Sequence, residues 1–219
     1  MPPAPKPPTP KLSSLSDQLY ERLRYEIICE DIKPGEKLVE LDLAARMGTS
    51  QGPVREALQR LERDGLVERR ARSATFVTRI SLDEMYEIFS IRSVIEGFAI
   101  RRTAQKITND QCSELDQLIE SMAEAGSHKE MIPLAEQDMQ FHRRIVEWSG
   151  SASLLRAWTP LSSQVQRFIV QTHPAEYPNY VEVGTRHQPI VDALYRRDGD
   201  GAATAVQAHI MLIWGKLAP

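Results

Sequence analysis

The sequence predicts a mainly α-helical protein with two parts, a winged helix-turn-helix unit followed by an all-helical bundle of six helices. Between Leu38 and Thr78 the order of signals is helix, turn, helix and two short strands. From Ser81 onward, apolar residues recur at helical spacing with few strand-like runs. The chain has 219 residues, which is enough for two domains of ordinary size.

The first helix of the helix-turn-helix is expected from an apolar face at helical spacing, formed by Leu41, Ala44, Ala45 and Met47. An earlier helix is expected upstream, with Leu19, Leu23 and Ile27 as its stripe. Gly48 ends the first helix of the helix-turn-helix, as a glycine after the last turn commonly does. Ser50 is placed to cap a second helix. Pro53 is tolerated in its first turn, because the missing backbone N–H would have no partner inside the helix.

The second helix has two opposite faces. Its buried stripe is formed by Val54, Ala57, Leu58 and Leu61, and its polar face by Gln51, Arg55, Gln59 and Glu62. A polar face with Gln and Arg near the N-terminus suits a helix that reads the major groove of DNA. After Gly65, strands are expected over 66–69 and 75–78, around a basic tip from Arg70 to Ala74 that can reach DNA.

The run from Gly48 to Val67, GTSQGPVREALQRLERDGLV, resembles the N-terminal domain of GntR-family bacterial transcription regulators. The resemblance covers Leu15 to Thr78, with 31–38 as the family's first connecting loop. Together with the helix pattern, it implies contacts with DNA from Ser50, Gln51, Gly52, Arg55, Arg70, Arg72 and Ser73.

Two positions depart from the family's pattern. Gln51 and Gly52 stand where the family usually has Arg-Thr, and Ala74 stands where the wing usually has glycine. Because Gln favours adenine where Arg favours guanine, we expect an operator that differs from the family's usual one. Arg55 corresponds to the family's recognition-helix arginine.

Composition agrees with a DNA-binding surface confined to one part of the chain. The formal net charge is −3, yet residues 46–79 contain eight arginines and four acids, a local balance of +4. The two cysteines are too few for a disulfide framework, and no membrane-length apolar run or leader is recognised, so a cytoplasmic protein is expected. Residues 1–12 form a proline-rich tail without expected regular structure.

The C-terminal part is expected to begin with two capping boxes, Ser81 to Glu84 and Thr108 to Gln111. The second of these helices should end at Gly126. Further helices are expected over 133–149, 152–172, 181–197 and 201–216, with Pro174 in a loop and Asp200 as the last cap.

Asp138 and His142 lie four residues apart on one expected helix, so both point to one face. His187 and His209 lie on later helices beside apolar residues. Each of the four also has a simpler interpretation, as part of an exposed charged pair or as a hydrogen-bonded core histidine. His128 and His173 are interpreted as surface or loop residues.

The segments around these four residues resemble the ligand segments of the FCD effector domain, found in the FadR-like branch of GntR regulators, and the six-helix form resembles its VanR-type members. The resemblance implies a divalent metal held by Asp138, His142, His187 and His209, with zinc first and nickel, manganese or iron as alternatives. It also implies that Arg92 faces an effector pocket and binds a carboxylate, although pairing with Glu96 one turn away is an open alternative.

These expectations combine into one function and one alternative. The favoured function is a metabolite-responsive repressor, a homodimer that binds a palindromic operator through residues 13–79 and binds metal, effector and partner subunit through residues 80–219. The alternative is a metal-dependent hydrolase or oxygenase fused to a DNA-binding head. No second carboxylate is expected near the ligands, which argues against that enzyme.

Overall fold

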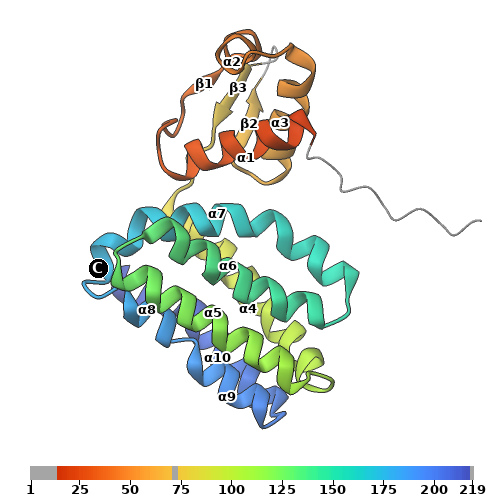
Figure 1. Ribbon diagram of the computed structural model, residues 1–219, viewed down its shortest axis with the longest axis vertical. Helices are drawn as coiled ribbons and strands as arrows, with labels where there is room; N and C mark the ends of the chain where they lie inside the picture. The colour runs from red at the N-terminus through yellow and green to blue at the C-terminus, as the bar shows by residue number, and fades with distance from the viewer. Residues whose placement is uncertain (1–13, 71–73, 218–219) are drawn as a thin grey trace, which may run out of the picture.

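The structure is a computed structural model that describes residues 14–70 and 74–217. The expected tail at 1–12 and the wing residues Arg72 and Ser73 therefore lie outside the described residues. The chain forms a small N-terminal head above a larger helical bundle (Figure 1), and each has its own hydrophobic core. The mainly α-helical fold class predicted from the sequence is confirmed.

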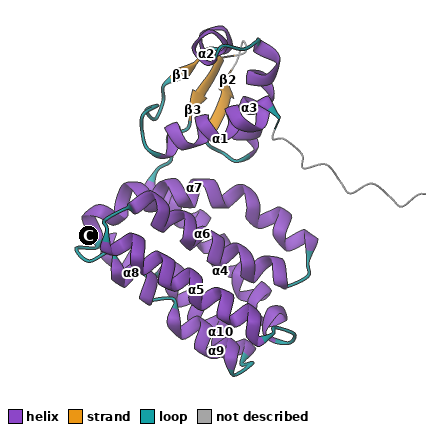
Figure 2. Cartoon of the chain, viewed as in Figure 1, coloured by secondary structure: helices purple, strands orange, loops and turns teal. Residues whose placement is uncertain are grey.

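The head consists of three helices and a small antiparallel sheet (Figure 2). Its elements are α1 (Leu15–Ile28), β1 (Lys37–Leu38), α2 (Glu40–Met47), α3 (Gln51–Arg63), β2 (Val67–Arg70) and β3 (Ala74–Val77). Strand β3 is central, with Lys37 of β1 opposite Phe76 and Glu68 of β2 opposite the same residue. The connecting loop expected over 31–38 thus ends in a third strand, which at two residues is too short to show an alternating pattern.

The recognition-helix pattern is confirmed, whereas the pattern of α2 was partly wrong. All four residues of the expected stripe of α3 are buried. In α2, Leu41 is 62% exposed and Ala45 is exposed, and Leu43 and Ala44 are buried instead. The helix has only eight residues and packs on α3 through one side, so a two-turn pattern did not define its orientation.

Helices α2 and α3 each end just before a glycine. Gly48 and Gly65 have φ of 64° and 69°, in the left-handed region that favours glycine after a helix. Ser50 is the N-cap residue of α3 as expected, but its side chain makes no capping hydrogen bond. Its hydroxyl is therefore not committed to the helix end.

The bundle contains α4 (Leu82–Ala104), α5 (Asn109–Ser127), α6 (Met131–Trp148), α7 (Ala152–Glu176), α8 (Val181–Thr185), α9 (Gln188–Tyr195), α10 (Gly199–Met211) and α11 (Trp214–Leu217). Helix α4 packs against α6, α7 and α10. The capping boxes that begin with Ser81 and Thr108 are both present. No helix among the described residues is long and apolar enough to cross a membrane.

Three helix ends in the bundle differ from the sequence prediction. Gly126 lies inside α5, and the chain turns instead at Lys129, with φ of 61°. Pro174 lies inside the last turns of α7 rather than in a loop, so the helix continues to Glu176. Asp198, not Asp200, caps α10, because its carboxylate accepts the Gly201 N–H at 2.9 Å.

The two helices expected over 181–197 and 201–216 are each divided in two, into α8 and α9 and into α10 and α11. The first break falls at His187, the N-cap of α9, and Pro189 follows at the start of that helix. Because proline has no backbone N–H, it cannot continue the hydrogen-bond ladder of α8. The break turns the His187 side chain toward the centre of the bundle.

Candidate metal centre and DNA-contact surface

The structure brings the four expected metal ligands together inside the bundle. Asp138 and His142 come from α6, His187 from the break before α9, and His209 from α10. One ligand atom from each lies within 4.8 Å of the others, and the rings of His187 and His209 are 4.0 Å apart. His142 and His187 are completely buried.

These four side chains present atoms that have no hydrogen-bond partner in the described part of the chain. The unpartnered atoms are Asp138 Oδ2, His142 Nε2, His187 Nε2 and His209 Nδ1. His187 Nε2 is 3.2 Å from Asp138 Oδ1, but the two atoms are not aligned as a hydrogen bond. Burying a polar group unpaired costs about 1–3 kcal/mol. Three imidazoles and one carboxylate are a suitable donor set for a divalent metal, which would give each atom a partner.

A second layer of contacts holds the ligands in orientation. Glu96 is fully buried, and its Oε2 accepts from His142 Nδ1 at 2.5 Å. Its Oε1 accepts from Arg92 Nε at 2.6 Å and from the Trp158 indole at 2.7 Å. His187 Nδ1 lies 3.1 and 3.0 Å from the carbonyl oxygens of Val183 and Gly184. Such contacts fix the ring so that Nε2 is left for a metal.

The charges around the cluster favour metal-binding protonation states. Burial raises the pKa of Glu96, but the charge of Arg92 and the hydrogen bonds from His142 and Trp158 outweigh that effect and lower it to about 2. Burial likewise opposes ionisation of Asp138, yet the neighbouring His187 lowers its pKa. Burial lowers the pKa of His142 and of His209. The carboxylates are therefore charged and these imidazoles neutral, as metal ligands must be.

Several residues of this region were missed or misassigned from the sequence. The expectation that no further carboxylate lies near the ligands is wrong, because Glu96 contacts His142 directly. Trp158, which the sequence does not single out, is buried and donates its indole N–H to Glu96. His173 was expected at the surface or in a loop and is only 7% exposed, because α7 continues past it. Extending the apolar stripe of α7 beyond Ile169 would have indicated its burial.

Beside the ligands lies a small cavity of ≈ 30 Å³, whose lining includes Arg92, Asp138, His173, Arg186 and His209. Arg92 bonds Glu96 through Nε, while its Nη2 is buried without a partner in the described residues. Both sequence interpretations of Arg92 are thus compatible with its position. Small-molecule sites typically measure about 300–1,000 Å³, so an organic ligand requires side chains to move apart.

The head presents its expected DNA contacts on the surface. Ser50, Gln51, Gly52 and Arg55 are all exposed at the start of α3. Arg55 donates to Glu40 at 3.1 and 2.8 Å, and this pairing raises the pKa of Arg55. Because the Arg55 side chain is 53% exposed, the pair is worth little and DNA can replace Glu40 as its partner.

A hollow of ≈ 430 Å³ lies among α2, α3 and the sheet. Its lining includes Gln51 and Arg55 together with Lys37 and Arg69, which the sequence did not single out as contacts. Arg70 is exposed at the end of β2 and pairs with Glu68 at 2.5 Å. The hollow thus gathers three cations, one amide and the Glu40 carboxylate on the face that carries the N-terminus of α3.

Comparison with known protein families gives two matches that together span most of the chain. Residues 15–77 match the model of bacterial regulatory proteins of the gntR family. Residues 87–211 match the FCD domain. The boundary between the matches agrees with the change from the head to the bundle.

Curated relatives match almost the full length. A protein of Paenarthrobacter nicotinovorans, named "Probable D-xylose utilization operon transcriptional repressor", is 31% identical over 90% of this chain and 86% of its own. The "HTH-type transcriptional repressor RspR" of Escherichia coli K12 is 29% identical over 91% and 87%. Among solved structures, E. coli McbR/YncC has a TM-score of 0.78 at 23% identity, covering 93% of this chain and 97% of that one. The last match supports the fold alone.

Proposed function

Because the chain belongs to the GntR family of bacterial regulatory proteins, in the FadR-like branch with an FCD domain, we propose that it is a repressor whose operator binding responds to a small carboxylate. It is a DNA-binding transcription regulator and not an enzyme. The observation that carries the proposal is the set of four buried, unpartnered ligand atoms beside a cavity lined by an unpartnered arginine nitrogen.

Operator contact is assigned to the exposed N-terminus of α3 and to the wing. Gln51 and Arg55 read base edges, Ser50 and Gly52 lie against the DNA backbone, and Arg70, Arg72 and Ser73 extend the contact from the wing. The exposed, clustered cations around the hollow of the head support this assignment. DNA replaces Glu40 as the partner of Arg55.

The bundle is proposed to hold zinc, with nickel, manganese or iron as alternatives, through Asp138, His142, His187 and His209. Nitrogen and oxygen donors from three helices suit each of these ions. The metal would supply a positive centre for an acid's carboxylate. Arg92 Nη2, buried beside Asp138 and His209, is the proposed partner for the same carboxylate.

A homodimer is proposed through the outer side of α4. Ile91, Val94 and Phe98 are 53%, 66% and 56% exposed at spacings of three and four residues, which places them on one stripe. A contiguous exposed apolar stripe of this kind is typical of an interface. Two-fold pairing presents two heads, which fits a palindromic operator. We propose 13–79 as the DNA-binding domain and 80–219 as the metal, effector and dimerisation domain.

A metal-dependent enzyme is not favoured. The relatives of this chain are named as regulators. Glu96, the additional carboxylate beside the ligands, accepts hydrogen bonds from Arg92, His142 and Trp158. A carboxylate in three strong contacts is poorly placed to accept a substrate's proton. A small acid that binds in the bundle is therefore proposed to act as an effector and not as a substrate.

An operator titration with and without candidate acids tests the proposal. Arg92→Lys keeps a cation beside Glu96 but loses the planar guanidinium group, which can donate two parallel hydrogen bonds to a carboxylate. We expect this variant to retain metal and operator affinity and to lose most of the acid-induced release. Arg156→Lys, on an exposed arginine of α7 that donates to Ser153, is the control. A wild-type response in Arg92→Lys would exclude Arg92 as the carboxylate partner.

A further inference from the structure

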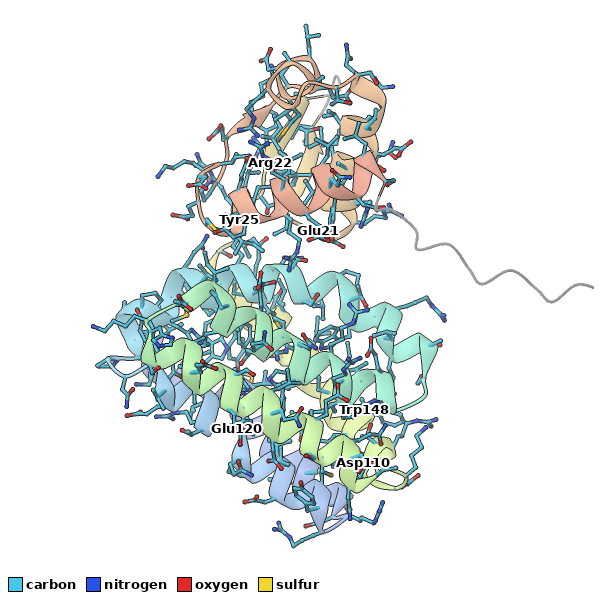
Figure 3. The ribbon with its side chains drawn as sticks, in the orientation of Figure 1. Glu21, Arg22, Tyr25, Asp110, Glu120 and Trp148 are labelled. Atoms are coloured by element: carbon cyan, nitrogen blue, oxygen red, sulfur yellow. The ribbon has the colours of Figure 1, made fainter. Side chains whose placement is uncertain are left out.

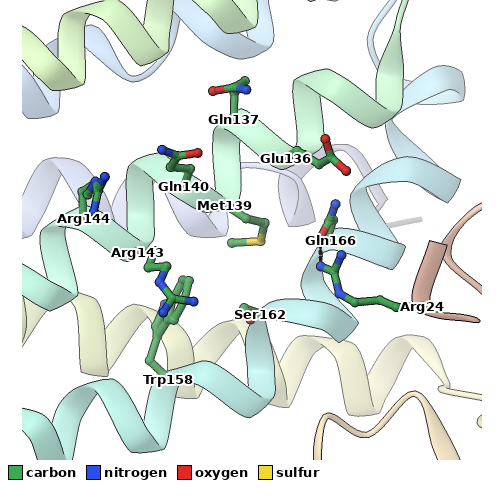
Figure 4. A pocket seen from close by; sticks show the side chains of 10 residues that line it. All are labelled: Arg24, Glu136, Gln137, Met139, Gln140, Arg143, Arg144, Trp158, Ser162 and Gln166. Atoms are coloured by element: carbon green, nitrogen blue, oxygen red, sulfur yellow. Dashed lines mark hydrogen bonds between the residues drawn. The ribbon is translucent and has the colours of Figure 1, made fainter. Parts of the chain in front are cut away.

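A further hollow, of ≈ 470 Å³, lies where α1 of the head meets α6 and α7 of the bundle (Figure 4). Arg24 enters it from α1, Met139 and Arg143 from α6, and Trp158 and Gln166 from α7. Tyr25 of the same helix also lies on the side of α1 that faces the bundle, outside this hollow (Figure 3). Both parts of the molecule therefore contribute to this hollow, which is separate from the small cavity beside the metal ligands.

One wall of the hollow holds a polar group that lacks a partner. Gln166 is only 2% exposed, and its Oε1 accepts a hydrogen bond from Arg24. Its Nε2 is buried and has no hydrogen-bond partner in the described residues. Figure 4 shows this nitrogen pointing away from Arg24, on the side of Glu136. Leaving such a donor unpaired is costly, so a ligand acceptor placed there would be stabilised.

Arg24 is the cation of this site that is least committed to the protein. Its hydrogen bonds go to Gln166 and to Ser163, which are neutral, and it forms no ion pair with any described residue. Arg143 and Arg144, at the other end of the hollow, are paired with carboxylates. An anionic group therefore gains most from binding beside Arg24 and Gln166.

The rest of the lining indicates the class of ligand. Gln137, Gln140 and Ser162 provide amides and a hydroxyl, and Glu136 provides one carboxylate that can accept from the hydroxyls of a ligand. Met139 and Trp158 provide a limited apolar floor. The volume falls within the usual range of about 300–1,000 Å³ for small-molecule sites. We propose that this hollow is a second ligand site, which binds a hydroxylated organic anion of sugar-acid size by its anionic group at Arg24 and Gln166.

Such a ligand would join the head to the bundle, since Arg24 belongs to α1 and Gln166 to α7. The floor of the hollow also contacts the layer behind the metal ligands, because Trp158 donates to Glu96 and Glu96 holds His142. The site does not rest on the metal-centred effector site and would bind its ligand if that site took none.

Isothermal titration of the metal-loaded full chain with D-gluconate and with citrate tests the proposal. D-Glucose and hexanoate are the controls, because one lacks the charge and the other the hydroxyls. We expect saturable binding of at least one hydroxylated anion that weakens at least tenfold in Arg24→Met and in Gln166→Glu. The second variant keeps the side-chain size and an acceptor for Arg24 but places a negative charge at the orphaned donor.

Arg22→Met, on the same helix but with a side chain 60% exposed, should bind as the wild type does. His187→Ala should keep this binding, since it removes only the metal-centred site. Absence of saturable binding of both anions by the wild type would overturn the proposal. So would binding that is lost in His187→Ala and retained in folded Arg24→Met and Gln166→Glu.

Discussion

The head and the bundle place their functional polar groups in opposite environments. In the head, Arg55 and Arg70 lie on the surface in exposed ion pairs, which contribute at most about 1 kcal/mol each. In the bundle, Asp138 Oδ2, His142 Nε2 and His187 Nε2 are buried without a hydrogen-bond partner among the described residues. The head can therefore fold without its ligand, whereas the folded bundle gains partners for its core only when a ligand is bound.

The largest effect expected from this difference is on stability. Removing metal with a chelator should lower the free energy of unfolding of the bundle by about 3–4 kcal/mol at metal concentrations 100–1,000 times the dissociation constant. Denaturant unfolding with and without chelator measures it. Arg55→Ala should show the same chelator effect as the wild type. A chelator effect of similar size in His187→Ala would contradict the assignment.

The second prediction concerns Glu96. Glu96→Gln keeps the side-chain shape but weakens the hold on His142, so metal affinity should fall about 10–100-fold. Competition with a chromogenic chelator measures the change. Glu147→Gln, which removes a partly exposed carboxylate from the same helix as His142, is the matched control. Unchanged affinity in folded Glu96→Gln would show that the ring of His142 is held by packing alone.

The third prediction compares two arginines of the head. If Arg55 contacts a base, Arg55→Ala should cost about 1–3 kcal/mol of operator binding and relax preference at one position in each half-site. Arg70→Ala should instead weaken binding to all sequences alike and reduce the salt slope by about one. Titrations of operator and random DNA at several salt concentrations separate these results. Equal loss on both DNAs in Arg55→Ala would make Arg55 a phosphate contact.

The smallest expected effect is that of Glu40. Because Glu40 pairs with an exposed arginine, Glu40→Gln should change the free energy of unfolding by less than about 1 kcal/mol. Its operator affinity should rise, since a negative charge leaves the face that meets phosphate. Unfolding and DNA titration of the same protein give both values. A fall in affinity would show that Glu40 orients Arg55 for base reading.

The accuracy of the sequence predictions followed the length of each pattern. The apolar and polar faces of α3 together form a pattern from Gln51 to Glu62, about three turns long, and the capping boxes are local, so these features could be predicted. The strand β1 and the buried face of α2 are short and depend on packing against distant elements. They were therefore missed or misassigned.

The same distinction applies to the sites. The four metal ligands lie in segments that resemble a known family, so their convergence could be anticipated, and the structure brings them together. Glu96 could be seen only as the neighbour of Arg92, because its contact with His142 joins residues 46 positions apart. The Arg24–Gln166 contact joins the two parts of the molecule and has no local signature.

Metal analysis tests the central claim most directly. Purified wild-type protein should contain about one divalent metal per chain, as four ligands around one ion imply. His187→Ala, which removes one of the four, should contain almost none while its head still binds DNA. Elemental analysis showing equal metal in the two proteins, or none in the wild type after growth with all four candidate metals, would contradict the account.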